Sequence, residues 1–113
     1  MFSINGTNIS LTRGDSATLS VDLTTQDGEA YELEAGDSLV LTVKRAATDE
    51  SIVFQLTADS QGTFTFLPST TESAKFGNYR YDIQLTTSAG EVYTVIPVSG
   101  FTLLEEVTWA AAE

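Results

Sequence analysis

Carboxylates are the only abundant side chains in this sequence that could do acid–base or metal chemistry. The chain has 16 Asp and Glu residues, 5 Lys and Arg residues, and neither His nor Cys. It therefore lacks the usual general base at neutral pH, the commonest transition-metal ligand and any thiolate. Paired carboxylates can hydrolyse glycosidic bonds, but no pair stands out, and 113 residues leave little room for a substrate cleft. We expect no enzymatic activity, no catalytic residue and no cofactor.

Calcium is the metal that these carboxylates would favour, because it takes several hard oxygen ligands. The candidate ligands are Asp22, Asp27, Glu29, Glu32 and Glu34, followed by Asp49, Glu50 and Asp59. Neither group has the alternating Asp spacing and the Gly of a dedicated calcium loop. The sequence favours a solvated acidic face, which keeps the chain soluble, over a metal site.

Arg13-Gly14-Asp15 spells the tripeptide that integrins recognise in exposed loops. A hairpin turn after the first strand, in which Gly supplies the backbone freedom, explains the same residues. Because a match of three residues has little specificity, we interpret the segment as a turn.

The overall charge limits the kinds of partner. The net charge is −11 and the isoelectric point is near 4.1, so phosphate backbones and anionic membrane surfaces would be repelled. No apolar run approaches the roughly 18 residues of a membrane span. The N-terminal residues have neither the basic start nor the apolar core of a signal peptide. We expect a soluble protein made in the cytoplasm that binds neither nucleic acid nor membrane.

The elements that must position all these residues are short strands, because apolar residues alternate with Thr, Ser and Asp along most of the chain. The expected strands are 8–12, 17–25, 38–45, 51–57, 62–67, 79–87 and 91–107. The apolar positions that they place together predict a core of Leu11, Leu19, Val21, Leu23, Leu39, Leu41, Val43, Phe54, Leu56, Phe64, Phe66, Tyr81, Ile83 and Leu85. The one expected helical piece is Ser69 to Lys75, where Ser69-Thr70-Thr71-Glu72 matches a capping box.

Seven or eight short strands separated by turns predict an all-β protein, an antiparallel sandwich of immunoglobulin-like type. We expect a single domain over 1–113, with its core at roughly 8–107. A tyrosine pair supports the sandwich. Tyr79 enters a long strand after a short turn, as in a tyrosine corner, so its hydroxyl is expected to bond the backbone within 73–77. Tyr81 would replace the second Cys of such a domain, with Leu41 or Val43 facing it across the core.

Two features near the end of the chain are candidates for docking. Pro97 interrupts the last strand, and because proline cannot donate to a ladder, it belongs on an edge or at a bulge. The backbone after Pro97 would then be open to another strand. Trp109 is the only tryptophan, and it either packs back over the sheet or serves as an exposed anchor.

Three stretches of the sequence resemble a known group of proteins. They are Asn8-Ile9-Ser10-Leu11-Thr12-Arg13-Gly14-Asp15, Glu34-Ala35-Gly36-Asp37-Ser38-Leu39 and Phe76-Gly77-Asn78-Tyr79-Arg80-Tyr81-Asp82-Ile83-Gln84-Leu85. With the closing Phe101-Thr102-Leu103, they resemble small prophage-encoded proteins of Gram-positive bacteria from the tail and baseplate region of siphophages. The resemblance covers roughly residues 8 to 107 and implies an immunoglobulin-like virion component. Its motifs are turns and core positions, and it brings no catalytic residues.

The resemblance implies a structural or assembly module that docks to other virion proteins. We expect a monomer or weak oligomer in isolation, made in the host cytoplasm and then built into the virion. The alternative is an adhesion or carbohydrate-binding module of a bacterial cell surface. That function requires exposed aromatic side chains on one sheet face, for which Tyr31 and Tyr93 are the candidates.

Overall fold

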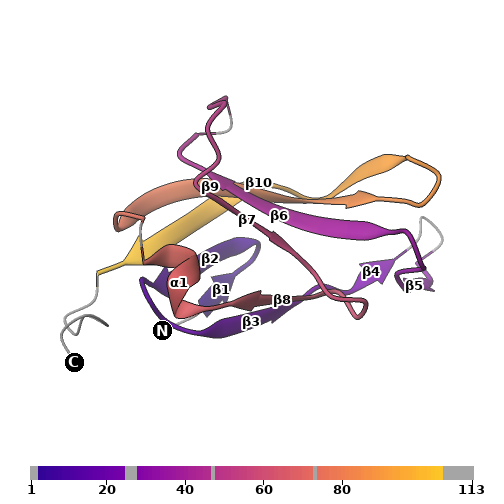
Figure 1. Cartoon of the computed structure of the whole chain (residues 1–113), viewed down its shortest axis with the longest axis horizontal. Coiled ribbons are helices and arrows are strands. Elements are labelled where there is room, and N and C mark those ends of the chain that lie inside the picture. Colours follow the sequence, from indigo (N-terminus) through magenta and orange to yellow (C-terminus); the bar gives the residue numbers. More distant parts are fainter. Residues whose placement is uncertain (1–2, 25–27, 47, 73, 106–113) are drawn as a thin grey trace.

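The computed structural model describes residues 3–24, 28–46, 48–72 and 74–105, which form mostly β-strands (Figure 1). The strands are β1 (Ser3–Asn5), β2 (Asn8–Thr12), β3 (Ala17–Ser20), β4 (Leu23–Thr24), β5 (Ala30–Tyr31), β6 (Ser38–Lys44), β7 (Phe54–Thr57), β8 (Thr63–Phe66), β9 (Gly77–Thr86) and β10 (Val92–Leu104). The only helix in these ranges is α1 (Pro68–Thr71). The predicted β-rich class is therefore confirmed. None of the described residues belongs to a helix long and apolar enough to cross a membrane.

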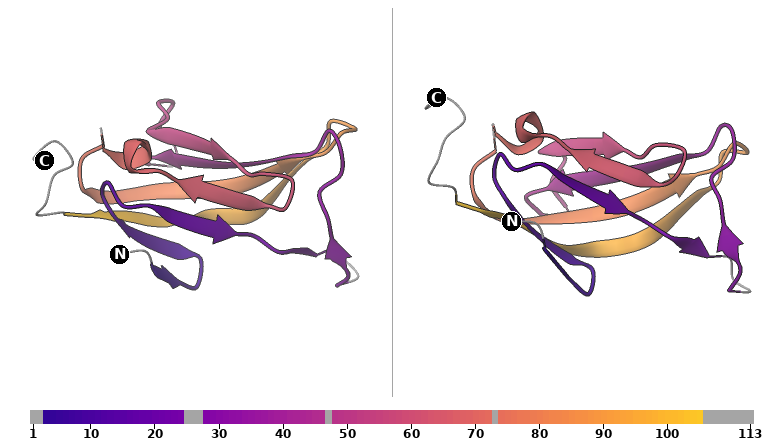
Figure 2. Two further views of the ribbon diagram at one scale, coloured as in Figure 1. Left: turned by 60° about the horizontal axis from the view of Figure 1, so that its bottom comes forward. Right: turned by 90° about the horizontal axis from the view of Figure 1, so that it is seen from below.

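The main sheet has six strands in the order β1-β2-β10-β9-β6-β7, and two small sheets pair β3 with β8 and β4 with β5. The expectation that every pairing is antiparallel is wrong at one place, because β2 runs parallel to β10. Alternation of apolar residues defines the faces of a strand but not the direction of its neighbour. The main sheet is thus a curled, mixed half-barrel, with β3 and β8 lying opposite its concave side (Figure 2).

The predicted strand boundaries agree with the structure for most elements. The segment 17–25 is an exception, since β3 ends at Ser20 and β4 begins at Leu23. Between them the amide of Val21 donates to the carbonyl of Gly62 at 3.0 Å. The last strand runs to Leu104 without a break, although its register with β9 shifts twice around Pro97. Strands β1 and β5 were not predicted, because each has only two or three residues.

The core fills the concave side of the main sheet. Nine of the predicted core residues are buried: Leu11, Leu39, Leu41, Val43, Phe64, Phe66, Tyr81, Ile83 and Leu85. The other five are half-buried and pack against that cluster: Leu19, Val21, Leu23, Phe54 and Leu56. Four buried apolar side chains were missed: Ile9, Tyr79, Phe101 and Leu103. Phe101 and Leu103 belong inside because β10 lies between β2 and β9 in the sheet, whereas the sequence placed it at an edge.

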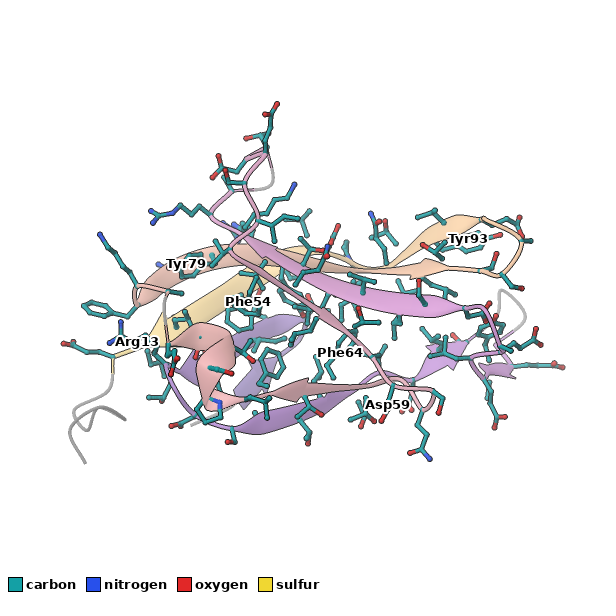
Figure 3. The ribbon with its side chains drawn as sticks, in the orientation of Figure 1. Arg13, Phe54, Asp59, Phe64, Tyr79 and Tyr93 are labelled. Atoms are coloured by element: carbon teal, nitrogen blue, oxygen red, sulfur yellow. The ribbon has the colours of Figure 1, made fainter. Side chains whose placement is uncertain are left out.

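Aromatic rings occupy the middle of this core. Phe101 stacks on Phe66 with ring centroids 6.1 Å apart, and it meets Phe54 and Tyr81 edge to face at 5.6 and 6.1 Å. Figure 3 shows Phe54 and Phe64 between the two layers of strands. Such aromatic pairs add about 0.5–1.5 kcal/mol beyond their buried area, so the two layers are held by directed contacts as well as by burial.

The helix begins one residue earlier than the sequence indicates. Pro68 is its first residue, and Leu67 occupies the N-cap in place of Ser69. The hydroxyl of Thr70 accepts a hydrogen bond from the Leu67 amide at 3.0 Å. Pro at the first helical position needs no donor and has its φ already set, which explains why the helix starts there.

Candidate functional site

Tyr79 makes the contact that the sequence predicts. Its hydroxyl donates to the carbonyl of Lys75 at 2.5 Å, and its side chain is only 6% exposed. Lys75 lies within the expected segment 73–77, in the link between α1 and β9. Figure 3 shows Tyr79 at the start of β9, near Arg13. The hydrogen bond ties the incoming loop to the strand, so the role of Tyr79 is to hold the backbone in place.

Tyr81 was expected to face Leu41 or Val43 across the core. The structure corrects this, because Val43 is the partner of Tyr81 on the adjacent strand of the same sheet. Its ring packs against Phe101, and its hydroxyl donates to the carbonyl of Thr7 in the turn between β1 and β2. Burial raises the pKa of this hydroxyl. Tyr81 therefore joins the N-terminal hairpin to the core.

The backbone from Phe101 onward is not an open edge. Residues Phe101–Leu103 pair with β9 on one side, and Phe101–Leu104 pair in parallel with β2 on the other. The side chain of Asn8 also accepts a hydrogen bond from the Gly100 amide at 2.8 Å. Among the described residues, the part of β10 that pairs only with β9 lies before Phe101, and there the register shifts and Pro97 itself disturb the ladder. Bulges and proline protect edges against additional strands, so Pro97 favours protection over docking.

Trp109 lies outside the described residues, so its two alternatives, packing back over the sheet or serving as an exposed anchor, stay open.

The Arg13-Gly14-Asp15 segment is described, and it forms a turn that packs against α1. Gly14 has a positive φ of 84°, and its amide donates to the buried hydroxyl of Thr71 at 2.8 Å. The guanidinium of Arg13 donates to the carbonyl of Ala74 at 3.2 Å. The residue types of this tripeptide are therefore explained by local structure.

Asp27 lies outside the described residues, and the other candidate calcium ligands do not converge. Among the residues that the structure describes, no three acidic side chains gather closely enough to hold a metal ion. Asp59 accepts hydrogen bonds from the amides of Gln61 and Thr63, which stabilises the turn between β7 and β8. The carboxylate of Asp59 therefore has a structural role in this turn.

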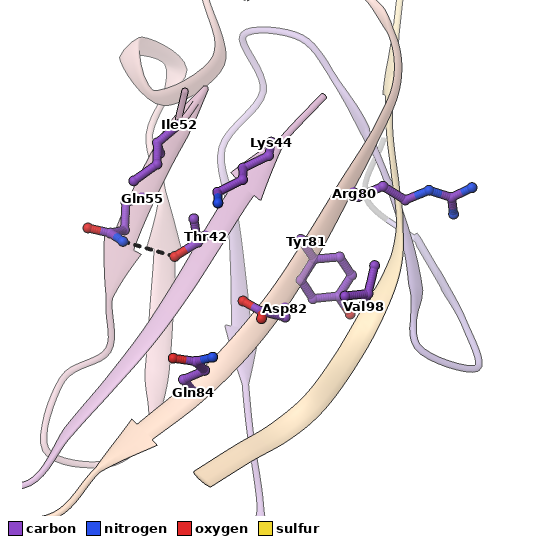
Figure 4. A pocket seen from close by; sticks show the side chains of 9 residues that line it. All are labelled: Thr42, Lys44, Ile52, Gln55, Arg80, Tyr81, Asp82, Gln84 and Val98. Carbon is purple, nitrogen blue, oxygen red and sulfur yellow. Dashed lines mark hydrogen bonds between the residues drawn. The ribbon is translucent and has the colours of Figure 1, made fainter. Parts of the chain in front are cut away.

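The outer face of the main sheet has a shallow groove of about 260 Å³ (Figure 4). Its walls come from the solvent-facing positions of four neighbouring strands, β7, β6, β9 and β10. The side chains that matter for recognition are Thr42, Lys44, Gln55, Arg80, Asp82 and Gln84. Two exposed apolar side chains, Ile52 and Val98, border the groove and are 49% and 54% accessible. The groove therefore offers hydrogen-bonding groups, charges of both signs and apolar contact together.

Two cations line this groove, and Figure 4 shows their charged ends pointing away from each other. Lys44 on β6 and Arg80 on β9 are directly opposite each other in the antiparallel register. Neither side chain has a hydrogen bond or an ion pair with another residue in the described part of the chain. Like charges at opposite positions of a strand pair destabilise it. Their divergence keeps this repulsion small in a chain with three times as many acids as bases.

A second, wider cleft of about 650 Å³ lies at the other end of the sheet. Its floor is apolar, and Tyr31 and Tyr93 line it together with Glu34, Asp37 and Glu91. The two tyrosines, far apart in the sequence, thus share one site. The hydroxyl of Tyr31 donates to Asp37 at 2.5 Å and that of Tyr93 to Glu91 at 3.1 Å.

Electrostatics in this cleft follow from those hydrogen bonds. The bond to Asp37, with partial burial and nearby carboxylates, raises the pKa of Tyr31 to about 12. The same bond and the amides of Glu34 and Ser88 lower the pKa of Asp37. The bond to Glu91 raises the pKa of Tyr93. At neutral pH the cleft therefore presents neutral phenol rings beside the ionised Asp37.

Comparisons with known proteins leave the family open. No known protein family matches the sequence. A search of curated proteins also gives no significant match.

Proposed function

We propose that this protein is a non-catalytic structural or assembly module of a phage or prophage virion, which acts by docking to other proteins. The observation that carries docking is the groove on the outer sheet face, where exposed Ile52 and Val98 accompany Lys44 and Arg80, whose side chains have no partner among the described residues. Interfaces combine apolar anchors with oriented charges in this way. The resemblance of residues 8–107 to siphophage tail and baseplate proteins supports the virion as the place of docking.

We also propose an immunoglobulin-like fold. The strand order β10-β9-β6-β7 is what the G, F and C strands and an added C′ strand of a variable-type domain would give. The Tyr79 hydrogen bond at the start of β9 corresponds to a tyrosine corner. These features support the assignment, whereas the small β3–β8 sheet is narrower than the second sheet of a full sandwich.

Deleting the gene from the bacterial strain that carries it tests the virion role. We expect induced cells to release few infectious particles, with aberrant tails by electron microscopy, and we expect a plasmid copy to restore infectivity. An empty plasmid is the control. Wild-type yields of infectious particles from the deletion strain would refute the role.

A carbohydrate-binding or adhesion module is the second candidate, and one observation favours it. Tyr31 and Tyr93 line the same cleft beside carboxylates, and sugar sites commonly use aromatic faces with hydrogen-bonding groups. Calorimetric titration with oligosaccharides from the cell wall of that strain tests this function. Saturable binding that Tyr93→Ala abolishes would favour it, whereas absence of binding would leave docking as the function.

A further inference from the structure

We propose that the cleft between Tyr31 and Tyr93 binds an arginine side chain of a neighbouring virion protein. This inference rests on the proposed docking function and specifies the chemistry of one contact. The cleft has a volume of about 650 Å³ and is lined by more apolar than polar surface. Cavities of this size, with an apolar lining and a few oriented polar groups, are typical of binding sites.

The floor of the cleft is the open end of the core. Leu85 of β9 is a buried core residue, and Leu23 of β4 and Val95 of β10 are half-buried beside it. The floor therefore joins the main sheet to the β4–β5 sheet. A ligand with methylene groups or a flat apolar face would remove this apolar surface from water.

Asp37 holds one wall of the cleft in place. Its carboxylate accepts hydrogen bonds from the hydroxyl of Tyr31 at 2.5 Å and from the amides of Glu34 and Ser88 at 2.9 Å. Gly36 packs so closely that a Cβ there would be 2.8 Å from the Cβ of Ser88. The ring of Tyr31 is thus positioned before any ligand arrives, which reduces the entropy cost of binding.

Tyr93 forms the opposite wall, and its side chain is 50% exposed. Its hydroxyl donates to Glu91 at 3.1 Å, while the amide of Glu91 donates to the hydroxyl of Thr87 at 3.1 Å. Exposed phenol rings attract cations through their faces. A guanidinium suits such a site, because it is planar, stacks on aromatic rings and binds carboxylates through two parallel hydrogen bonds.

Hydrogen-bond acceptors outnumber donors among the side chains of the cleft. The carboxylate of Glu34 has no partner in the described part of the chain, and that of Glu91 accepts only from Tyr93. Both phenol hydroxyls already donate to carboxylates. The remaining donors are three hydroxyls, those of Thr24, Thr87 and Ser88. A ligand that mainly donates is therefore favoured, and a guanidinium, with five N–H groups and no acceptor, is such a ligand.

The basic residues of the chain lie far from the cleft. Strand β6 runs from Ser38, which pairs with Thr86 beside the cleft, to Lys44, which pairs with Arg80. Those six residues span about 20 Å of strand. The other three bases also lie at that far end: Arg45 directly after Lys44, Lys75 bonded to Tyr79, and Arg13 bonded to Ala74. The carboxylates of the cleft therefore have no Lys or Arg beside them, and the net charge of −11 attracts cations.

A single side chain makes a small contact, so we expect an isolated arginine peptide to bind with a dissociation constant of roughly 1–10 mM. Salt should weaken this binding by screening the carboxylates. In a particle, the other contacts of the neighbouring protein would hold its arginine at the cleft and raise the effective concentration.

Nuclear magnetic resonance titration of the 15N-labelled full chain tests the site. The probe is acetyl-Gly-Arg-Gly-amide, and the matched control carries citrulline, which has nearly the shape of arginine without its charge. We expect saturable amide shifts confined to residues around Tyr31 and Tyr93 with the arginine peptide, and none with citrulline. Equal shifts with both peptides, shifts spread over the whole acidic surface, or saturation only by a cell-wall oligosaccharide would overturn the inference.

Two variants separate the ring from the charge. Tyr93→Leu and Glu91→Gln should each weaken binding of the arginine peptide about fivefold, because one removes the aromatic face and the other the carboxylate. Glu72→Gln is the matched control, since it loses the same charge at an exposed position outside the cleft. Amide spectra that match those of the unaltered protein show that each variant is folded. Equal weakening by Glu72→Gln and Glu91→Gln would contradict a specific site.

The two proposals fail separately. A protein that is absent from purified particles but binds the arginine peptide in its cleft would contradict the virion role alone. A protein that is present in particles but shows no shifts with the arginine peptide would contradict the arginine site alone.

Discussion

At the scale of single residues, tyrosine hydroxyls tie loops to strands. Tyr79 holds Lys75, Tyr81 holds Thr7, and Tyr31 holds Asp37. No buried side-chain nitrogen or oxygen among the described residues lacks a hydrogen-bond partner. Removal of one such hydroxyl leaves its partner unsatisfied, which costs stability.

Replacing Tyr79 by Phe should lower the free energy of unfolding by about 0.5–1.5 kcal/mol, because the Lys75 carbonyl loses its donor. Urea denaturation measures the change. Tyr93→Phe is the control, since the hydroxyl of Tyr93 bonds only to Glu91 at the surface. Equal losses for the two variants would show that the Tyr79 hydroxyl has no special role.

Asp37 should make stability depend on pH in acid. Hydrogen bonds from Tyr31, Glu34 and Ser88 lower its pKa in the folded state, so the carboxylate stabilises the fold above its unfolded pKa, near 3.9. That contribution is lost as pH falls through the lower folded pKa. Thermal melts of Asp37→Asn should therefore be less sensitive to pH below about 4. An unchanged pH profile would contradict the role of Asp37.

The same hydrogen bond acts in the opposite direction at alkaline pH. The pKa of Tyr31 is raised to about 12, so its neutral form stabilises the fold fully below about pH 10 and less as pH rises toward 12. Tyr31→Phe should remove this part of the alkaline loss of stability. The remaining loss of stability at alkaline pH comes from Tyr81 and Tyr93, whose pKa values are also raised in the folded state.

At the scale of elements, the single turn α1 anchors the turn that follows β2. Thr71 is fully buried and accepts a hydrogen bond from the Gly14 amide. Thr71→Val keeps the shape but strands that amide, so we expect a loss of about 1–3 kcal/mol. Ser69→Ala, at an exposed position of α1, should stay within about 0.5 kcal/mol. Denaturant titrations that rank the two variants equally would disprove the anchor.

The sequence predicted the faces of the strands better than their neighbours. Leu39, Leu41 and Val43 alternate with polar residues, and their burial followed directly. Phe101 and Leu103 alternate in the same way, but their burial depends on β2 arriving from the far end of the chain. Strand pairing over such distances leaves no local signal.

The groove on the outer sheet face could not be predicted from the sequence either, because it depends on which strands are neighbours. Lys44 and Arg80 occupy polar positions of two correctly predicted strands, and only the register of β6 with β9 places them opposite each other. The sequence did single out Tyr31 and Tyr93, although for a sheet face, whereas the structure puts them in a cleft at one end.

At the scale of the whole molecule, self-repulsion dominates the electrostatics. With a net charge of −11, added sodium chloride should raise the melting temperature by screening like charges. Millimolar calcium at matched ionic strength should add nothing, whereas an ion bound at a hundredfold its dissociation constant would add about 2.7 kcal/mol. A rise with calcium but not with magnesium would reveal a metal site.

The virion role is the central claim, and the composition of purified particles tests it most directly. Particles induced from the strain that carries the gene are separated by density, and each fraction is quantified by mass spectrometry. We predict that the protein accompanies the tail proteins at a constant ratio in every particle fraction. Its absence from the particles, with the protein remaining in the soluble lysate, would contradict the account.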